Sequence, residues 1–202
     1  MYLVATLVDA SKYAKKILQS VPENSVVLLP EAVSLNGSFV KRISSERGLF
    51  IIYNSDMVEN GKRYIAMRCV DNGEEVWRVR KFKLWHTDIE DGFSASRAEP
   101  IVKIRGKTAA LFICYDLVTI GRDNRLFALG RALQKYKSEI LLLAANWAFN
   151  FGLVENIIDT AMNNIGSLRA CLFSCTNTFG IATLQDRIRR LKKLGWIGFD
   201  LV

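Results

Sequence analysis

The chain has 202 residues, 50% of them hydrophobic, and a formal net charge of +8 at pH 7. This length and composition exclude an intrinsically disordered protein and fit one domain with a sizeable core. The longest apolar run is far shorter than the roughly 20 residues that cross a bilayer. The first residues have no basic lead-in and no long apolar region, so we expect no signal peptide, and the four cysteines lack the spacing of a disulfide framework. We therefore expect a single cytoplasmic domain over residues 1–202, with reduced thiols and no membrane partner.

The start of the chain alternates strand and helix patterns. Residues 2–8 predict a buried strand, and an apolar stripe after Ser11 predicts a capped helix. A second buried strand is expected at 25–32, where Pro30 stops it, and a second helix at 38–47. This order is typical of a sheet that is covered by helices.

The middle of the chain predicts hairpins. The Asn-Gly pairs at 60–61 and 72–73 are the strongest short-range hairpin signal. The expected elements are strands at 49–54, 63–70 and 75–82, an irregular stretch at 83–100, and a hairpin of strands 101–104 and 108–114 about a turn at 105–107.

The last part of the chain returns to alternating helices and buried strands. A basic cluster lies near its end, with Ile188, Leu191 and Leu194 at helical spacing between the charges, and predicts an amphipathic helix with a solvated basic face. A nucleic-acid or anionic-lipid patch is the alternative, and we expect no nucleic-acid partner. The expected elements are helices at 125–136, 154–168 and 187–194 and strands at 139–145, 170–175 and 197–202. The whole pattern predicts an α/β layered architecture with mixed sheets.

Three of the expected strands end on a reactive side chain, namely Glu31, Lys81 and Cys114. Strand ends deliver side chains to a shared crevice, so a carboxylate, an ammonium and a thiol could meet there. A carboxylate can take the proton of the thiol, and an ammonium can stabilise the oxyanion of a tetrahedral intermediate. This set predicts a thiol hydrolase or transferase that does not need histidine.

Four segments resemble the signatures of the nitrilase superfamily, the carbon–nitrogen hydrolases: V-L-L-P-E at 27–31, R-K-F-K-L at 80–84, I-C-Y-D-L at 113–117 and A-N-W at 145–147. Their order and strand context agree with that family from about residue 2 to residue 180. The resemblance implies a four-layer α-β-β-α sandwich. It also implies that Glu31 is the general base, Lys81 the oxyanion stabiliser and Cys114 the nucleophile.

The resemblance extends to further residues. It implies that Tyr115, Asn146 and Trp147 line the substrate pocket. It also makes Glu90 the candidate for a second active-site glutamate, although the Pro-Gly that usually follows this glutamate is absent. Lys83 stands where the family usually has a histidine. After residue 177 many members have a further strand pair, and the chain is expected to lack it, which gives a shortened C-terminal part.

Each candidate has a plainer interpretation. Cys114 could be a core residue, and Arg80 or Lys83 could take the place of Lys81. His86, the single histidine, is the only rival base but lacks a supporting Asn or Asp. Cys171 and Cys175 are expected in the core because a zinc site would need further ligands. We expect no metal, and no cofactor, because the chain has no phosphate-binding glycine motif.

The expected function is hydrolysis of a small-molecule amide through a cysteine thioester, in a homodimer or larger homo-oligomer as the resemblance implies. Several alternatives stay open at this point. The protein could be a catalytically silent member that serves as a binding or scaffold module. Within enzymes, a carbamoylated amine or a nitrile could be the substrate, or an acyl group could pass to an acceptor other than water.

Overall fold

The computed structural model describes residues 1–7, 11–31, 33–96, 99–114, 116, 133–145, 156, 158–159, 161–163, 165–175, 179–183, 189–191 and 195–201. Its elements in chain order are β1 (Tyr2–Leu7), α1 (Ser11–Ser20), β2 (Val26–Leu28), α2 (Gly37–Arg47), β3 (Phe50–Asn54), β4 (Met57–Glu59), β5 (Lys62–Tyr64), β6 (Ala66–Asp71), β7 (Glu74–Arg80), α3 (His86–Glu90), β8 (Ile101–Ile104), β9 (Lys107–Ile113), β10 (Ile140–Ala145), β11 (Ala170–Cys175), β12 (Phe179–Thr183), β13 (Arg189–Leu191) and β14 (Gly195–Asp200).

Two mixed sheets, each with six strands, form the body of the molecule. The first has the strand order β14-β1-β2-β3-β6-β7 and the second β13-β12-β11-β10-β9-β8. In each sheet three consecutive strands run parallel, β1-β2-β3 and β9-β10-β11, and antiparallel strands flank them. Parallel neighbours need crossover connections, which explains the helical patterns between the strands of each trio.

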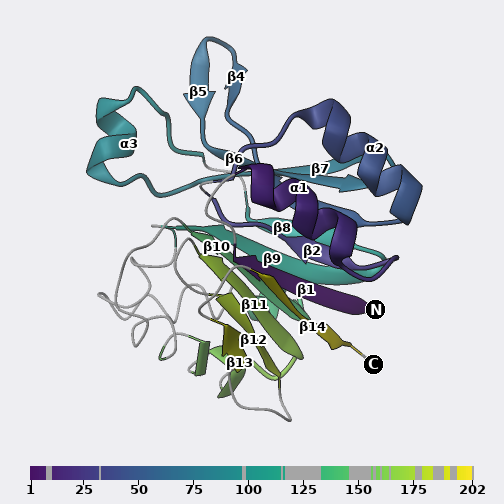
Figure 1. The fold of residues 1–202 in the computed structure, drawn as a ribbon. Helices are drawn as coiled ribbons and strands as arrows, with labels where there is room; N and C mark the ends of the chain where they lie inside the picture. The colour runs from purple at the N-terminus through teal and green to yellow at the C-terminus, as the bar shows by residue number, and fades with distance from the viewer. Residues whose placement is uncertain are drawn as a thin grey trace.

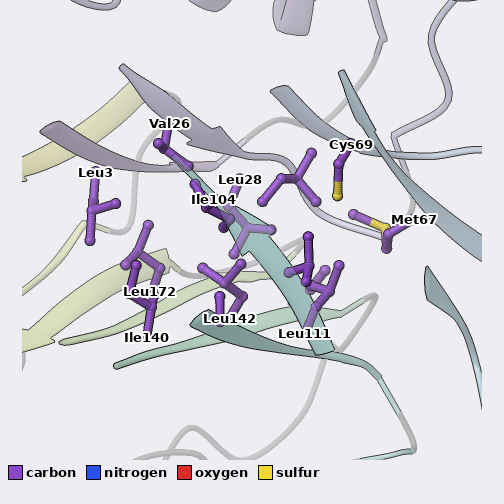
Figure 2. Close-up of a cluster of buried hydrophobic side chains, with 14 of the residues drawn as sticks. Leu3, Val26, Leu28, Met67, Cys69, Ile104, Leu111, Ile140, Leu142 and Leu172 are labelled. Atoms are coloured by element: carbon purple, nitrogen blue, oxygen red, sulfur yellow. The ribbon is translucent and has the colours of Figure 1, made fainter. Parts of the chain in front are cut away.

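Alternation of side chains along the strands builds four layers. One apolar cluster lies between the two sheets, and Figure 2 shows Leu3 and Leu28 of the first sheet with Leu111 and Leu142 of the second. A second cluster joins the outer face of the first sheet to α1 and α2, which cover it in Figure 1. A third joins the outer face of the second sheet to described residues of the 133–168 region, Ile158 among them. The expected α/β fold with mixed sheets is confirmed, and the packing of the described residues agrees with an α-β-β-α sandwich.

The predicted hairpin turns are confirmed. Asn60-Gly61 and Asn72-Gly73 both have positive φ, with values of 50° and 72° and of 47° and 84°. This is the conformation of the two-residue type I′ turn, which Asn-Gly adopts at low cost. Arg105-Gly106, with φ values of 48° and 85°, forms the same turn between β8 and β9.

The middle of the chain differs from the prediction in two places. The expected strand at 63–70 is divided, because β5 ends at Tyr64 and forms a separate two-stranded sheet with β4, while β6 begins at Ala66 and joins the first sheet. The stretch at 83–100, expected to be irregular, contains the five-residue helix α3. A helix of this length shows no apolar period, so its pattern is indistinguishable from a loop. Figure 1 shows α3 and the β4–β5 hairpin at the same end of the molecule.

The predicted basic helix at 187–194 is wrong. Residues 189–191 form β13, which pairs antiparallel with β12 at the edge of the second sheet. Edge strands tolerate charged residues and are often marked by them, so a short basic segment fits this place. The strand pair that the chain was expected to lack after residue 177 is therefore present as β12 and β13, and the predicted last strand is confirmed as β14.

The two longer helices predicted in the second half lie only partly within the described residues. Of 125–136 the structure describes residues 133–136, of which 133–135 are helical, and Leu133 is buried. Of 154–168 it describes helical residues at 156, 158–159 and 161–163, and Ile158 and Ala161 are buried as the apolar period predicts. No helix within the described ranges is long and apolar enough to cross a membrane.

One arginine fastens the two sheets together at the end where β2, β3 and β9 begin. Arg105 donates to the carbonyl oxygens of Asn24 and Gly48, at 2.5 Å each, and to the Asp71 carboxylate at 2.9 Å. The guanidinium therefore connects the turn of the second sheet to three segments of the first, at the end opposite to Glu31 and Cys114.

Replacing Arg105 by alanine is expected to lower the free energy of unfolding by about 1–3 kcal/mol, because hydrogen bonds to a charged group are lost in a half-exposed place. Urea unfolding followed by tryptophan fluorescence measures this loss. The control is Arg42→Ala, whose partner Glu46 is exposed on the same helix, with an expected effect of at most about 0.5 kcal/mol. Equal losses in both variants would contradict the role of Arg105 between the sheets.

Candidate active site

Glu31 lies three residues after the end of β2, and its side chain reaches the interior. Hydrogen bonding of the Leu29 amide to Ile52 continues the ladder for one residue, and Pro30, which has no amide hydrogen, ends it. The chain then turns, and the Glu31 side chain lies buried, with 7% of the residue exposed. A carboxylate in this place needs a partner, since an unpaired buried charge is costly.

That partner is Lys81, the first residue after β7. Its amide donates to the carbonyl of Ile65 at 2.9 Å, and its own carbonyl accepts from Ser96 at 3.0 Å, so the backbone is fixed on both sides. The side chain is buried at 2% exposure, and its Nζ lies 2.8 Å from Oε1 of Glu31 and 3.0 Å from Oδ2 of Asp88. Lys81 therefore lies between two carboxylates.

The surroundings keep the Lys81 ammonium protonated. Burial alone lowers its pKa, but the charges of Glu31 and Cys114, together with the hydrogen bonds to Glu31 and Asp88, raise the pKa above the usual range of lysine. A lysine of this kind donates hydrogen bonds at neutral pH and does not act as a base. Because the charge of Cys114 contributes to the raised pKa of Lys81, the sulfur and the ammonium lie within electrostatic range of one another.

Cys114 occupies a strained turn at the end of β9. Its φ is 48°, a region that non-glycine residues seldom adopt, at a cost of order 1–3 kcal/mol. Its amide donates to the carbonyl of Ala144 at 2.7 Å, which ties the turn to the end of β10. Cys114 is partly exposed, whereas Cys69 and Cys171 are buried within the strands. A strained residue at the end of a buried strand is typical of a functional position.

Asp116 lies two residues further and is fully buried. Its Oδ1 accepts from the amides of Phe82 at 3.1 Å and Lys83 at 2.6 Å, and its Oδ2 accepts from the amide of Ile113 at 3.1 Å. Burial raises the pKa of Asp116 to about 8, against the opposing effects of these amides and of the charge on Lys81. The carboxyl group thus connects the segment after Lys81 to the end of the strand before Cys114.

The structure places Asp88, not Glu90, against Lys81. Glu90 is the last residue of α3 and its side chain is exposed. Asp88 lies in the first turn of α3, where its carboxylate accepts from the amide of Trp85 at 2.8 Å and also contacts Lys81. An acid at the third position of a helix, three residues after the N-cap Trp85, was the available signal, because carboxylates there cap the first turn.

The rival residues lie elsewhere. Arg80 pairs with Glu59 at 2.6 Å, and the side chain of Lys83 is exposed. His86 is exposed at the start of α3, with its ring 4.6 Å from that of Trp85. The positions of Arg80 and Lys83 leave Lys81 as the cation beside Glu31, and no contact joins His86 to Cys114 among the described residues.

The predicted pocket residues Tyr115, Asn146 and Trp147 lie outside the described residues. Within the described part of the chain no group of three His, Cys, Asp or Glu side chains could hold a metal ion. Of the two cysteines that were expected in the core, Cys171 is buried there, and the side chain of Cys175 is not among those described.

Comparison with known proteins gives a match in structure only. No family model and no curated protein matches the sequence. Among solved structures, a mutant of the Nesterenkonia amidase from the nitrilase superfamily matches with a TM-score of 0.78 at 14% identity, covering 100% of this chain and 90% of the amidase chain. A CN-hydrolase superfamily protein from Xanthomonas campestris, with an arsenic adduct in its active site, matches with a TM-score of 0.78 at 11% identity, over 98% and 89%.

A further structure of the Nesterenkonia amidase shows covalent addition of the acetamide moiety of fluoroacetamide at the active-site cysteine. It matches with a TM-score of 0.76 at 14% identity, covering 100% of this chain and 90% of that chain. The chain therefore has the fold of nitrilase-superfamily amidases, as the sequence motifs imply, and extends over nine-tenths of the matched chain.

Proposed function

We propose that this chain is a carbon–nitrogen hydrolase of the nitrilase superfamily that cleaves a small-molecule amide through a thioester on Cys114. The observation that carries the proposal is the buried Lys81 ammonium, held at 2.8 Å by Glu31 and at 3.0 Å by Asp88, within electrostatic range of Cys114. A thiol, a protonated lysine and a carboxylate at neighbouring strand ends are the parts that acyl transfer requires.

The first half of the reaction forms the thioester. The Glu31 carboxylate takes the proton from Cys114, and the thiolate sulfur forms a bond to the amide carbon. The electrons of the C=O bond move to oxygen, where the Lys81 ammonium and a backbone amide donate hydrogen bonds. The oxyanion then collapses, the C–N bond breaks, and the leaving nitrogen receives the proton that Glu31 holds.

The second half releases the acid. Glu31 takes a proton from water, the oxygen attacks the thioester carbon, and the C–S bond breaks as the sulfur leaves. The proton returns from Glu31 to the thiolate, so the site regains its first state. Lys81 stays protonated throughout, which agrees with the direction of its pKa. Each proton transfer contributes about 10²–10⁴-fold and each oxyanion donor about 10²–10³-fold.

The first substrates to test are short aliphatic amides. Two structures of the Nesterenkonia amidase hold adducts of such compounds at the active-site cysteine, one from Michael addition of acrylamide and one from fluoroacetamide. Both compounds are neutral and small, and both bear the primary amide that a hydrolase of this fold would recognise. We therefore propose a primary aliphatic amide as the substrate class.

Ammonia release from acetamide and propionamide, together with mass mapping of cysteines after exposure to acrylamide, tests the proposal. We expect saturable ammonia release and much faster labelling of Cys114 than of Cys69 and Cys171, which are buried. Labelling should slow in Glu31→Gln, which keeps the shape of the side chain but cannot take the thiol proton. Labelling of Cys114 at the rate of Cys69, without ammonia release, would instead identify a catalytically silent module with this fold.

A further inference from the structure

The carboxyl group of Asp116 lies beside the site but has no part in the proposed reaction. It is fully buried and accepts three backbone N–H bonds, at 3.1, 2.6 and 3.1 Å. Burying an acid is costly, so a carboxyl group that only fills space would be poorly placed here. The backbone groups that donate these hydrogen bonds indicate a role in positioning.

Those bonds join two segments that carry different parts of the site. Oδ1 accepts from Phe82 and Lys83, which directly follow Lys81. Oδ2 accepts from Ile113, which directly precedes Cys114. The two oxygens of one carboxyl group lie about 2.2 Å apart, so this arrangement fixes the separation of the two backbones more tightly than side-chain packing can.

A second contact joins the same two segments. The ring of Phe82 packs edge-to-face against that of Phe112, with centroids 5.9 Å apart, and Phe112 lies on β9 two residues before Cys114. The Lys81 segment therefore rests on the second sheet through an aromatic pair and is held there by the carboxyl group. Its other hydrogen bonds, to Ile65 and Ser96, do not reach the second sheet.

We propose that Asp116 is a positioning residue that clamps the Lys81 segment to the strand end of Cys114 and so sets the distance between ammonium and sulfur. The inference deepens the proposed function, since it rests on Lys81 and Cys114 acting together. Misplacement of a reacting group by about 1 Å costs roughly 10²-fold in rate, so a clamp at this place has a measurable effect.

Electrostatics and positioning predict opposite changes in the rate of Cys114 alkylation when Asp116 is replaced by asparagine. The titratable groups around the site are Glu31, Lys81, Asp88 and Asp116. Above a pH of about 8, where the Asp116 carboxyl is ionised, replacing it by asparagine removes a negative charge, which by Coulomb's law alone would favour the Cys114 thiolate and speed its alkylation. Loosening the clamp moves the ammonium away from the sulfur and disfavours the thiolate, so alkylation slows.

The test compares wild type, Asp116→Asn, Asp116→Ala and the control Asp71→Asn. Asparagine keeps the size of the side chain and one acceptor oxygen, but its NH₂ group cannot accept from Ile113. The control makes the same chemical change at the opposite end of the sheets, where Asp71 accepts from Arg105. The measurements are the rate of Cys114 alkylation by iodoacetamide against pH, the melting temperature, and kcat and KM for propionamide.

We expect the pH midpoint of Cys114 alkylation to be about one unit higher in Asp116→Asn than in wild type. This shift corresponds to a tenfold fall in the thiolate fraction at neutral pH. Propionamide kcat should fall by about 10²-fold with KM nearly unchanged, and Asp116→Ala should be affected more strongly. Asp71→Asn should lose melting temperature but keep the wild-type midpoint.

Two results would overturn the clamp: an alkylation midpoint that stays or falls in Asp116→Asn while the melting temperature drops, or equal effects in Asp71→Asn. The alkylation arm needs no substrate, so the clamp is tested even if wild type hydrolyses no amide. In that case a raised midpoint in Asp116→Asn supports the clamp while the proposed function fails. A wild-type Cys114 that reacts no faster than Cys69 overturns both.

Discussion

Replacing Cys114 by alanine is expected to reduce amide hydrolysis by about 10⁵–10⁶-fold, because the variant lacks the thiol that forms the thioester. Among the described cysteines, Cys69 and Cys171 are buried within strands, and burial raises the pKa of Cys69 far above the usual range. Neither can substitute as nucleophile. Ammonia release under substrate saturation measures the loss.

The stability of Cys114→Ala should stay within about 1 kcal/mol of wild type, since the side chain is small and partly exposed. Cys171→Ala is the matched control: it creates a small cavity in the core and is expected to lose stability but not activity. Full activity in Cys114→Ala would contradict the thioester mechanism. A large loss of stability in the same variant would instead assign Cys114 to the core.

The three principal site residues were accessible from the sequence for one physical reason. Lys81 and Cys114 directly follow a strand, Glu31 lies three residues beyond one, and the rigid backbone of a strand fixes where the residues just after it lie. The strands are visible as apolar runs and as Asn-Gly hairpins, both of which are local patterns. The positions of these three residues were therefore predictable, because local sequence patterns determine the strands that precede them.

Asp88 was missed because its position depends on a contact that is not local. The sequence favours Glu90 by its resemblance to a family motif, but α3 turns Glu90 to solvent and Asp88 towards Lys81. Five helical residues leave no periodicity, and the loop is placed by contacts to the β4–β5 hairpin, such as the amide of Ser94 donating to Arg63 at 2.7 Å. Only the assembled structure decides which acid faces inward.

The basic segment before the last strand was misassigned for a related reason. Apolar residues at 188, 191 and 194 have helical spacing, but 189–191 pair with β12 in the second sheet. The second sheet repeats the strand directions of the first, and β13 completes this repeat by corresponding to β7. Pairing with β12 thus outweighs the helical spacing of this segment.

Replacing Lys81 by methionine should cost both activity and stability, through two separable effects. Loss of the ammonium removes the charged donor to the oxyanion, so kcat should fall by at least 10²–10³-fold. Loss of the same charge leaves Glu31 and Asp88 facing one another at 9% and 16% exposure without a cation. Breaking a buried ion pair in this way costs about 3–5 kcal/mol.

The double variant Lys81→Met with Asp88→Asn separates the two effects. Neutralising Asp88 removes the repulsion between the carboxylates, so urea unfolding should regain a large part of the lost stability, while kcat stays as low as in Lys81→Met. The matched control is Lys107→Met, whose partner Glu139 is half-exposed, with an expected loss of at most about 1 kcal/mol. If Asp88→Asn restored activity together with stability, Lys81 would serve only to neutralise the two acids, and the oxyanion would have to be stabilised by backbone amides alone.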